Sequence, residues 1–364
     1  MQRVKVYVDV ENTVPDRKPR QKNIERQALG EIKNTILTRS KYLELKQGIK
    51  KINIKDQPKQ KTKRSIITKK ASCKKVESND ETNKSPQITR RRRLSSLFRV
   101  SEYANDIYKY LQRIEDKYPI SSNAWMEIRF GENTRFALVD WLVEINEHFQ
   151  FVHETFQLCI SIIDRYIQED YSLNKRKDLQ LIALAGVFIA SKYEEIIPLE
   201  INDLLYVCDS SLSTDEILKM EMKIVTDMQC SFGRPVPAHF VRRYSNVAKA
   251  TNVEQACAFY LTDVALMSYK LCYMKPSIIA ASALYIAMCV SNGEVDQSLW
   301  SLTLIKYSTY HVQDLKDCLK TLAKCLKKTK SSRYQAIEKK YSKQEYFNVS
   351  QITELQTVID ALAQ

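Results

Sequence analysis

The sequence predicts an all-α protein, and three observations lead to this fold class. From Val100 onward, apolar residues recur at helical spacing in segments of about 10 to 18 residues, separated by short turns containing Pro, Asn, Gly or Ser. No segment shows the strict alternation of a strand. The chain has only six glycines, too few for the turns and phosphate-binding loops of a nucleotide-binding sheet protein. A hydrophobic content of 44% excludes a wholly disordered chain.

The chain divides by charge near residue 100. The first 100 residues carry 28 Lys and Arg against 10 Asp and Glu, a net charge of +18, whereas the remainder carries −4. This first segment has only three aromatic residues, so it cannot bury enough apolar surface to offset its chain entropy. We therefore expect a disordered basic regulatory arm over residues 1–98. A solubilising or loosely nucleic-acid-binding arm is the alternative.

The helical segments follow in order and are expected at residues 101–118, 122–129, 134–149, 153–169, 178–192, 199–207, 213–229, 236–249, 253–270, 275–291, 298–306 and 311–328. Ser213 and Glu216 have the spacing of a capping box, in which each side chain satisfies a first-turn N–H. Pro198, Pro235 and Pro276 lie near helix starts, where the missing N–H is harmless.

Two of these segments are alike. Residues 185–190 (AGVFIA) and 282–287 (SALYIA) superpose at an offset of 97 residues, and both are apolar all round and rich in small side chains. Such a helix is surrounded by others at close backbone approach. The likeness indicates an internal repeat with a central helix in each bundle of about five, although two unrelated buried helices of similar composition are the alternative.

Residues for catalysis or metal binding are missing from the sequence. The nine cysteines are scattered singly, which fits neither a disulfide framework nor a zinc site and indicates small core residues in a reducing compartment. The four histidines have no paired ligand spacing, and no phosphate loop, nucleophile elbow or kinase catalytic set occurs. The longest apolar run, 277–290, is too short for a membrane span, and no secretory signal is present. We expect a soluble intracellular protein that is not an enzyme, with no catalytic residue, cofactor, metal or membrane partner.

Three motifs resemble those of the cyclin family. Residues 134–144 (TRFALVDWLVE) are similar to the cyclin-box signature, and the run 181–195 ends in ASKYEE, like a second element of that family. Residues 220–221 followed by 233–243 (GRPVPAHFVRR) resemble the joint between the two boxes of mitotic B-type cyclins. Because the motifs occur in order and at family spacing, the chain is identified as a member of the cyclin family, of the mitotic B type, with the B3 kind among the candidates.

The resemblance covers about residues 100–330 and implies two tandem five-helix cyclin-box repeats, at 122–232 and 233–330. An N-terminal helix at 99–121 would precede them, and a C-terminal tail at 331–364 would follow. It implies a regulatory subunit that binds and activates a cyclin-dependent kinase in G2 and mitosis and recruits substrates. A transcriptional cyclin or a cyclin-fold nucleic-acid-binding factor is the alternative. The latter would carry a C-x-x-C zinc ribbon and basic repeats, which are absent here, so a nucleic-acid partner is not expected.

The resemblance assigns a kinase-binding site to the first box. Lys192 and Glu221 match residues that hydrogen-bond the backbone around the kinase's regulatory helix, supplying a donor and an acceptor to groups otherwise left unpaired. Tyr193 and Leu199 would supply hydrophobic area. From the residues alone, Lys192 could also be a solvated helix end that complements the helix dipole.

The resemblance to cyclins also implies a docking strip for R-x-L peptides of kinase substrates, formed by Leu138, Trp141, Glu144 and Gln180. The Leu of the peptide would enter an apolar slot and its Arg would meet a carboxylate. Thr134 and Ala137 stand where the family often has Met and Ile, so we expect a shallower or wider slot and weaker docking. Periodicity alone leaves open that Trp141 simply packs the bundle.

His239 and Arg243, four residues apart on one predicted helix, could together hold a phosphate, as in some B-type cyclins. Thr226 stands where a third basic group would be expected. A solvated helix face is the alternative explanation for this pair.

The basic arm carries a motif of the destruction-box form R-x-x-L-G-x-I-x-N. Its five fixed positions are Arg26, Leu29, Gly30, Ile32 and Asn34. A ubiquitin ligase of the anaphase-promoting type would hold the Arg by carboxylates and the Leu in an apolar pocket, leading to ubiquitin-dependent degradation. Basic clusters at 61–64, 69–70, 74–75 and 90–93 are of the nuclear-import type, so we expect a nuclear protein that can shuttle with the cytoplasm; nonspecific electrostatics is the alternative.

Overall fold

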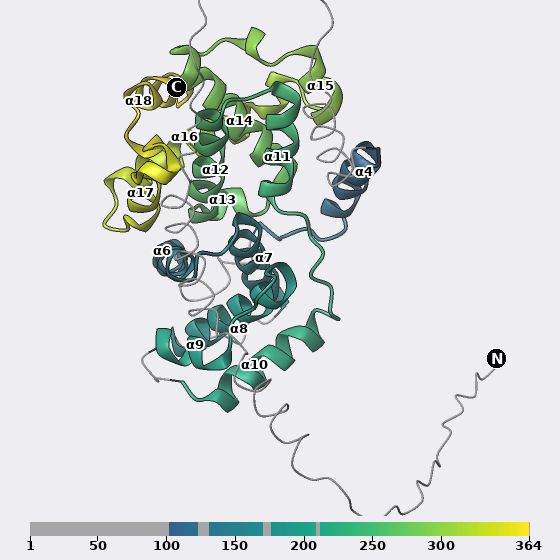
Figure 1. Cartoon of the computed structure of the whole chain (residues 1–364), viewed down its shortest axis with the longest axis vertical. Coiled ribbons are helices and arrows are strands. Elements are labelled where there is room, and N and C mark those ends of the chain that lie inside the picture. The colour runs from purple at the N-terminus through teal and green to yellow at the C-terminus, as the bar shows by residue number, and fades with distance from the viewer. Residues whose placement is uncertain (1–101, 123–130, 170–175, 209–211, 364) are drawn as a thin grey trace, which may run out of the picture. The chain divides into compact units, whose positions relative to one another are not determined.

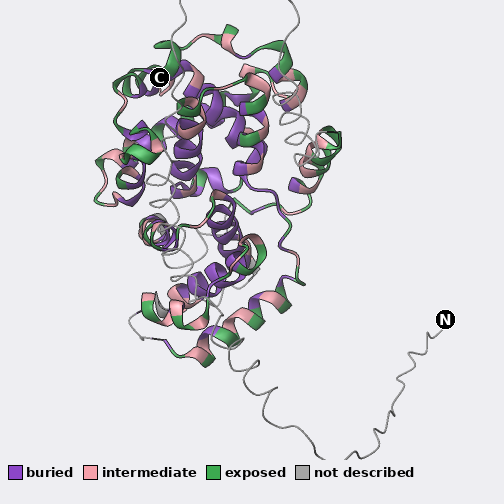
Figure 2. Cartoon of the chain, in the orientation of Figure 1, coloured by how far each residue is buried: buried purple, intermediate pink, exposed green. Residues whose placement is uncertain are grey.

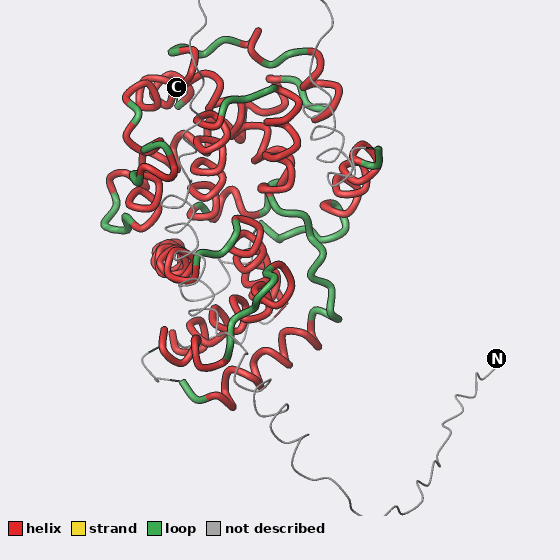
Figure 3. Tube along the Cα trace, in the orientation of Figure 1, coloured by secondary structure: helices red, strands yellow, loops and turns green. Residues whose placement is uncertain are grey.

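The computed structural model describes residues 102–122, 131–169, 176–208 and 212–363 (Figure 1). Within these ranges every regular element is a helix, as the sequence predicts (Figure 3). The predicted arm at 1–98, with its destruction-box motif and basic clusters, lies outside the described residues. So does nearly all of the helix expected at 122–129.

The first bundle consists of α6 (Gly131–Phe149), α7 (His153–Glu169), α8 (Arg176–Glu194), α9 (Ile201–Val207) and α10 (Thr214–Asp227). Its central helix is α8, which packs against α6, α7 and α10 and is buried throughout residues 182–190 (Figure 2). Gly186 permits the close approach of α7, because a Cβ at this position would lie 3.1 Å from Cγ1 of Ile163.

The second bundle contains α11 (Pro237–Ala248), α12 (Asn252–Met267), α13 (Tyr269–Cys272), α14 (Pro276–Asn292), α15 (Leu302–Ser308) and α16 (Lys316–Ser331), with 3₁₀ turns at Gln297–Leu299 and Val312–Leu315. Here α14 is central: residues 279–287 are all buried, and the helix packs against α11, α12 and α16. The prediction that the two similar segments are central helices is confirmed.

Helix α4 (Ala104–Glu115) corresponds to the predicted N-terminal helix and packs on the second bundle. The hydroxyl of Tyr108 donates to the carbonyl of His239 at 3.1 Å. The buried carboxylate of Glu115 accepts hydrogen bonds from Ser277, at 3.2 Å from the backbone N–H and 2.7 Å from the hydroxyl. Buried carboxylates require such donors, so these contacts fix the end of α4.

A buried ion pair joins α6 to α7. The guanidinium of Arg135 donates to both carboxylate oxygens of Asp164, at 3.2 and 2.7 Å, and a third N–H donates to the carbonyl of Leu266 in α12. Arg135 lies in the segment that resembles the cyclin-box signature. Its role here is structural, since it connects both bundles within the core.

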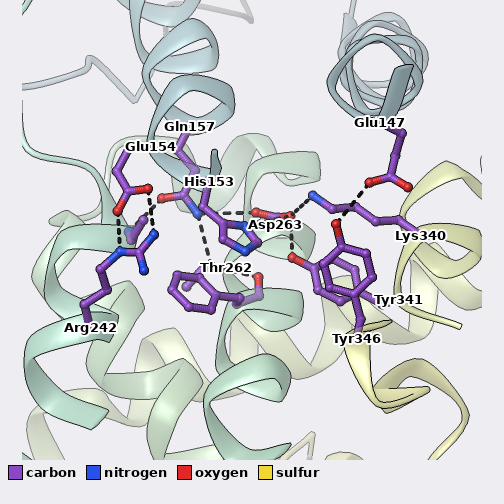
Figure 4. A network of polar contacts seen from close by, with 12 residues as sticks. Glu147, His153, Glu154, Gln157, Arg242, Thr262, Asp263, Lys340, Tyr341 and Tyr346 are labelled. Atoms are coloured by element: carbon purple, nitrogen blue, oxygen red, sulfur yellow. Dashed lines mark hydrogen bonds and ion pairs between the residues drawn. The ribbon is translucent and has the colours of Figure 1, made fainter. Parts of the chain in front are cut away.

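The segment at 331–364, for which the sequence predicted no helix, forms α17 (Ala336–Tyr341), two 3₁₀ turns at Gln344–Tyr346 and Val349–Gln351, and α18 (Thr353–Leu362). Buried Lys340 and Tyr341 donate to the carboxylate of buried Asp263, at 3.0 and 2.7 Å (Figure 4). Gln157 of α7 donates to the other oxygen of this carboxylate at 3.3 Å. The Asp263 carboxylate in α12 thereby accepts hydrogen bonds from both the C-terminal segment and α7.

The structure also tests the predicted helix caps, helix boundaries and cysteine burial. The capping box is confirmed: Ser213 Oγ accepts from the N–H of Glu216 at 3.2 Å, and the Glu216 carboxylate accepts from the Ser213 N–H at 2.8 Å. Helix α11 begins at Pro237, one residue after its predicted start, so Pro235 does lie near a helix start. The helix expected at 253–270 divides at Ser268, whose backbone is extended and whose hydroxyl caps α13. Of the eight described cysteines, seven are buried, as expected of core residues.

Candidate functional site

Lys192 lies in the last turn of α8 and Glu221 in the middle of α10, and the structure brings them together in an ion pair. Their side chains are 40% and 13% exposed, respectively, so the pair is open to solvent on the lysine side. The ammonium also lies 3.9 Å from the centre of the Phe188 ring, one helical turn earlier. Both groups keep hydrogen-bonding capacity toward a partner, because an ammonium has three donors and a carboxylate several acceptor positions.

Large apolar side chains are exposed close to this ion pair along the chain. They are Tyr193 in the last turn of α8, Ile196 in the loop that follows it, and Leu218 and Met222 on α10. Leu218, Glu221 and Met222 fall at i, i+3 and i+4, so they share one face of α10. Ile196 is 99% exposed. We call these four side chains together with Lys192 and Glu221 the α8–α10 patch. Exposed apolar side chains gathered around a polar centre are typical of a protein-binding surface.

Leu199 does not belong to this surface, contrary to its predicted role in kinase contact. Its side chain is only 4% exposed, and its backbone N–H donates to the hydroxyl of buried Ser191 at 3.3 Å. The loop after α8 therefore turns back into the core before α9 begins. Sequence reasoning missed Leu218 and Met222, because an i, i+4 apolar pair on a helix is ordinarily assigned to the core. It also missed Ile196, which lies in the loop after α8.

Three of the four predicted docking residues, Leu138, Trp141 and Gln180, line a groove of about 510 Å³. Its other walls are formed by Asn133, Thr134, Ala137, Leu179, Arg333 and Tyr334. Leu138 and Leu179 form a largely buried apolar floor beside partly buried Trp141. Glu144 is exposed on α6 and is not among the lining residues. Both departures from the family, Thr134 and Ala137, do line the groove.

The wall formed by Arg333 and Tyr334 was not predicted. This segment follows α16 and is fixed against α6, since the N–H of Ala336 donates to the Asp140 carboxylate at 2.8 Å. Burial raises the pKa of Asp140, and this hydrogen bond opposes the effect. The two segments are 196 residues apart in sequence. No local sequence pattern signals a contact over such a separation.

His239 and Arg243 share α11 but contact different groups. The Nδ1 atom of His239 accepts the N–H of Val236 at 3.2 Å, and burial lowers the pKa of this imidazole. The guanidinium of Arg243 instead donates to Asn105 of α4 at 2.6 Å and lies 5.3 and 4.8 Å from the ring centres of Tyr108 and Tyr307. A pocket of about 200 Å³ there is lined by Arg243 with Lys109 and Lys306 but not by His239. The phosphate site therefore stays a prediction. Of its two proposed residues, only Arg243 lines this cationic pocket.

No group of three or more His, Cys, Asp and Glu side chains within the described ranges is arranged to hold a metal ion. In the same part of the chain, no helix has the length and apolar character needed to cross a bilayer.

Comparison with known protein families gives two matches that cover most of the helical region. Residues 106–233 match the model described as cyclin, N-terminal domain, and residues 235–355 match cyclin, C-terminal domain. A viral cyclin from herpesvirus saimiri has a similar structure, with a TM-score of 0.54 at 20% identity, covering 60% of this chain and 96% of that chain. This last likeness concerns the fold alone.

Curated relatives are more similar in sequence. The G2/mitotic-specific cyclin-B2 of Oryzias latipes is 36% identical over 269 residues, which cover 72% of this chain and 68% of that protein. The G2/mitotic-specific cyclin-B of Spisula solidissima is 35% identical over 282 residues, covering 78% of this chain and 61% of that protein.

The two matched domains and the two helical bundles define a regulatory protein of the cyclin fold, and the chain belongs to the cyclin family. Within this family its similarity is to the mitotic B type, as the sequence motifs predicted. Cyclins act as regulatory subunits of protein kinases rather than as catalysts.

Proposed function

We propose that this chain binds a cyclin-dependent kinase through the α8–α10 patch and activates it in G2 and mitosis. The observation that carries the proposal is the Lys192–Glu221 ion pair, surrounded by exposed Tyr193, Ile196 and Met222. A partner that covers this patch removes apolar area from water and meets donors and acceptors at its centre.

Activation follows from preferential binding to one kinase conformation. Kinase catalysis requires a Glu on the regulatory helix to pair with the Lys that holds the ATP phosphates. A protein that binds the inward position of that helix more tightly shifts the equilibrium toward the active arrangement. Lys192 and Glu221 would pair with backbone groups at the end of the helix, which have no partners within it. This chain contributes no group to the chemical step.

The proposal is tested by purifying the tagged full chain from dividing cells and measuring which kinase is retained. We expect one cyclin-dependent kinase at near-equal stoichiometry with the parent chain. Retention should be lost with Lys192→Ala and Glu221→Ala combined, and kept with Lys316→Ala, an exposed lysine on α16. A parent chain that retains no such kinase would refute the proposal.

We propose also that the groove beside Trp141 docks substrate peptides of the R-x-L type, with weakened affinity. Its apolar floor and its volume of about 510 Å³ support this use. The position of Glu144 outside the lining, together with Thr134 and Ala137 inside it, supports weak rather than strong docking of that motif.

The arm supplies two further proposals, nuclear localisation through its basic clusters and ubiquitin-dependent destruction through the motif that begins at Arg26. Both rest on sequence motifs alone. They concern the timing and place of kinase activation, whereas the α8–α10 patch concerns the activation itself.

A further inference from the structure

The docking groove has a charged wall that its sequence resemblance does not account for. Among the described lining residues, Arg333 alone carries a formal charge, and it faces a floor made by Leu138, Leu179 and Trp141. The acidic residue expected to meet the Arg of an R-x-L peptide, Glu144, is not part of the lining. The charge within the groove is therefore positive, where the resemblance implies a negative one.

The position of Arg333 is fixed by its neighbours. The turn after α16 is closed by Gln335, whose side-chain amide donates to the carbonyls of Ser332 and Thr329 at 2.5 and 3.3 Å. The backbone N–H of Tyr334 donates to the Ser332 hydroxyl at 2.9 Å. The following N–H, of Ala336, is bonded to α6 through the Asp140 carboxylate at 2.8 Å. These bonds hold the turn against the groove.

The guanidinium itself is supported by an aromatic side chain. It lies 4.9 Å from the centre of the Tyr334 ring, and one of its N–H groups donates to the Tyr334 hydroxyl at 2.7 Å. Tyr334 in turn contacts the ring of buried Phe136, with centroids 6.3 Å apart. No ion pair joins Arg333 to a described carboxylate. Because a guanidinium has five N–H donors, most remain available to a ligand.

We propose that Arg333 makes the groove selective for acidic peptides, in which a carboxylate flanks the apolar side chain that enters between Leu138, Leu179 and Trp141. The proposal rests on the peptide-docking function proposed above and specifies its substrate class. A carboxylate can accept two parallel N–H bonds from a guanidinium, and the adjacent apolar floor lowers the local dielectric. A basic residue in the same place would meet a like charge, so the groove would disfavour it.

The size of the preference follows from the exposure of the arginine. Arg333 is exposed, and exposed ion pairs contribute modestly and are screened by salt. We expect an acidic flank to bind about 3- to 5-fold more tightly than a neutral one at low ionic strength. The preference should shrink as salt is raised, whereas the contribution of the apolar anchor should not.

The test is fluorescence anisotropy of labelled peptides with the full chain. Each peptide has one leucine anchor and carries Glu, Gln or Lys beside it, placed before the leucine in one set and after it in a second. The parent chain should prefer Glu over Gln over Lys in at least one set. Arg333→Gln should abolish the preference, and Arg333→Glu should reverse it. Lys316→Glu, the same charge change at the far end of α16, should leave the parent ranking intact.

The outcomes separate this inference from the docking function on which it rests. If peptides bind and Trp141→Ala removes binding, but the flank ranking is the same in parent and Arg333→Glu chains, the groove docks peptides and the acidic preference is refuted. An R-x-L peptide is titrated alongside. If it binds the parent chain but no peptide with a Glu flank binds, docking stands and this inference is refuted; if none of the peptides binds, both are refuted.

Discussion

The ion pair between Lys192 and Glu221 is open to solvent on the lysine side, with Lys192 40% exposed. Exposed ion pairs contribute little to folding, with a median of about 0 to 1 kcal/mol. Removing either group should therefore leave the fold intact, so that a loss of kinase binding reports on the interface. Buried Arg135 and Asp164 are the contrasting case, since removing either one would leave the other charge buried without its partner and strongly destabilise the fold.

At the groove, the two departures from the family motif can be reversed. Thr134→Met together with Ala137→Ile should tighten binding of an R-x-L peptide, because larger side chains give its leucine more apolar surface to contact. A gain of some 40–60 Å² at about 25 cal/mol per Å² corresponds to about 1–1.5 kcal/mol, or roughly tenfold in Kd. Isothermal titration measures this directly.

Trp141→Ala is the corresponding loss-of-binding variant in the same titration. It should abolish peptide binding without changing kinase binding. Equal affinity of the parent and the restored groove would mean that Thr134 and Ala137 do not limit docking.

His153 makes folding dependent on pH. Burial lowers the pKa of its imidazole from 6.5 to about 4, opposed by buried Asp263; Lys340 and Arg242 add to the lowering, whereas Glu154 opposes it. Because the folded-state pKa lies below the unfolded one, the unfolded chain binds more protons between pH 6.5 and about 4. Stability should fall as pH drops through this window, by at most about 1.4 kcal/mol per pH unit from this group.

Urea unfolding at several pH values measures this contribution. His153→Gln should lose it, whereas His148→Gln, a change at an exposed histidine on α6, should keep it. An unchanged pH slope in His153→Gln would rule out this histidine as the source.

At the scale of elements, the C-terminal segment is part of the folded unit. Asp263 is fully buried in α12, and burial by itself would raise the pKa of its carboxyl, but Lys340, His153 and Tyr341 hold the pKa below its usual value. The carboxylate is therefore charged and depends on α17 for its main partners (Figure 4). Since α17 begins at Ala336, which is bonded to Asp140, the same helix supports one wall of the docking groove.

Lys340→Met should destabilise the protein by about 3–5 kcal/mol, because it leaves the Asp263 carboxylate buried without its cation. Lys339→Met, at the exposed neighbouring position, should change stability by less than about 0.5 kcal/mol. Thermal unfolding of the two variants makes the comparison, and equal stability would show that Lys340 does not hold α17 in place.

The helices that carry the α8–α10 patch could be predicted from the sequence, because apolar periodicity and capping residues such as Ser213 act locally. The motifs also singled out Lys192 and Glu221 as candidate kinase-binding residues, although the ion pair between them was not predicted. What could not be predicted depends on how the chain packs. Leu199 is buried in a loop that turns back onto α8, where its N–H bonds to Ser191. Helix α17 is short and polar, and its Lys340 finds its buried partner, Asp263, 77 residues earlier in the chain. The place of Arg333 in the groove could not be predicted either, because its segment is held against α6 by the bond between Ala336 and Asp140, 196 residues apart.

At the scale of the whole molecule, the proposed degradation signal and the proposed kinase surface belong to separate parts of the chain. Replacing Arg26 and Leu29 by Ala should therefore stabilise the protein through mitotic exit without altering kinase activation. Its half-life in a mitotic extract is the measurement, with Gln21→Ala as a control change in the same arm that removes no lysine. If the half-life stays that of the parent chain, this motif is not the degradation signal.

The central claim is that the α8–α10 patch activates a cyclin-dependent kinase, and a titration of purified kinase with the full chain tests it most directly. Lys192→Ala or Glu221→Ala should each leave kinase backbone groups unpaired, at about 1–3 kcal/mol, and shift half-maximal activation about 5- to 150-fold. The double variant, shown to be folded by its circular dichroism, should be nearly inert. Full activation by that double variant at nanomolar concentration would contradict the account.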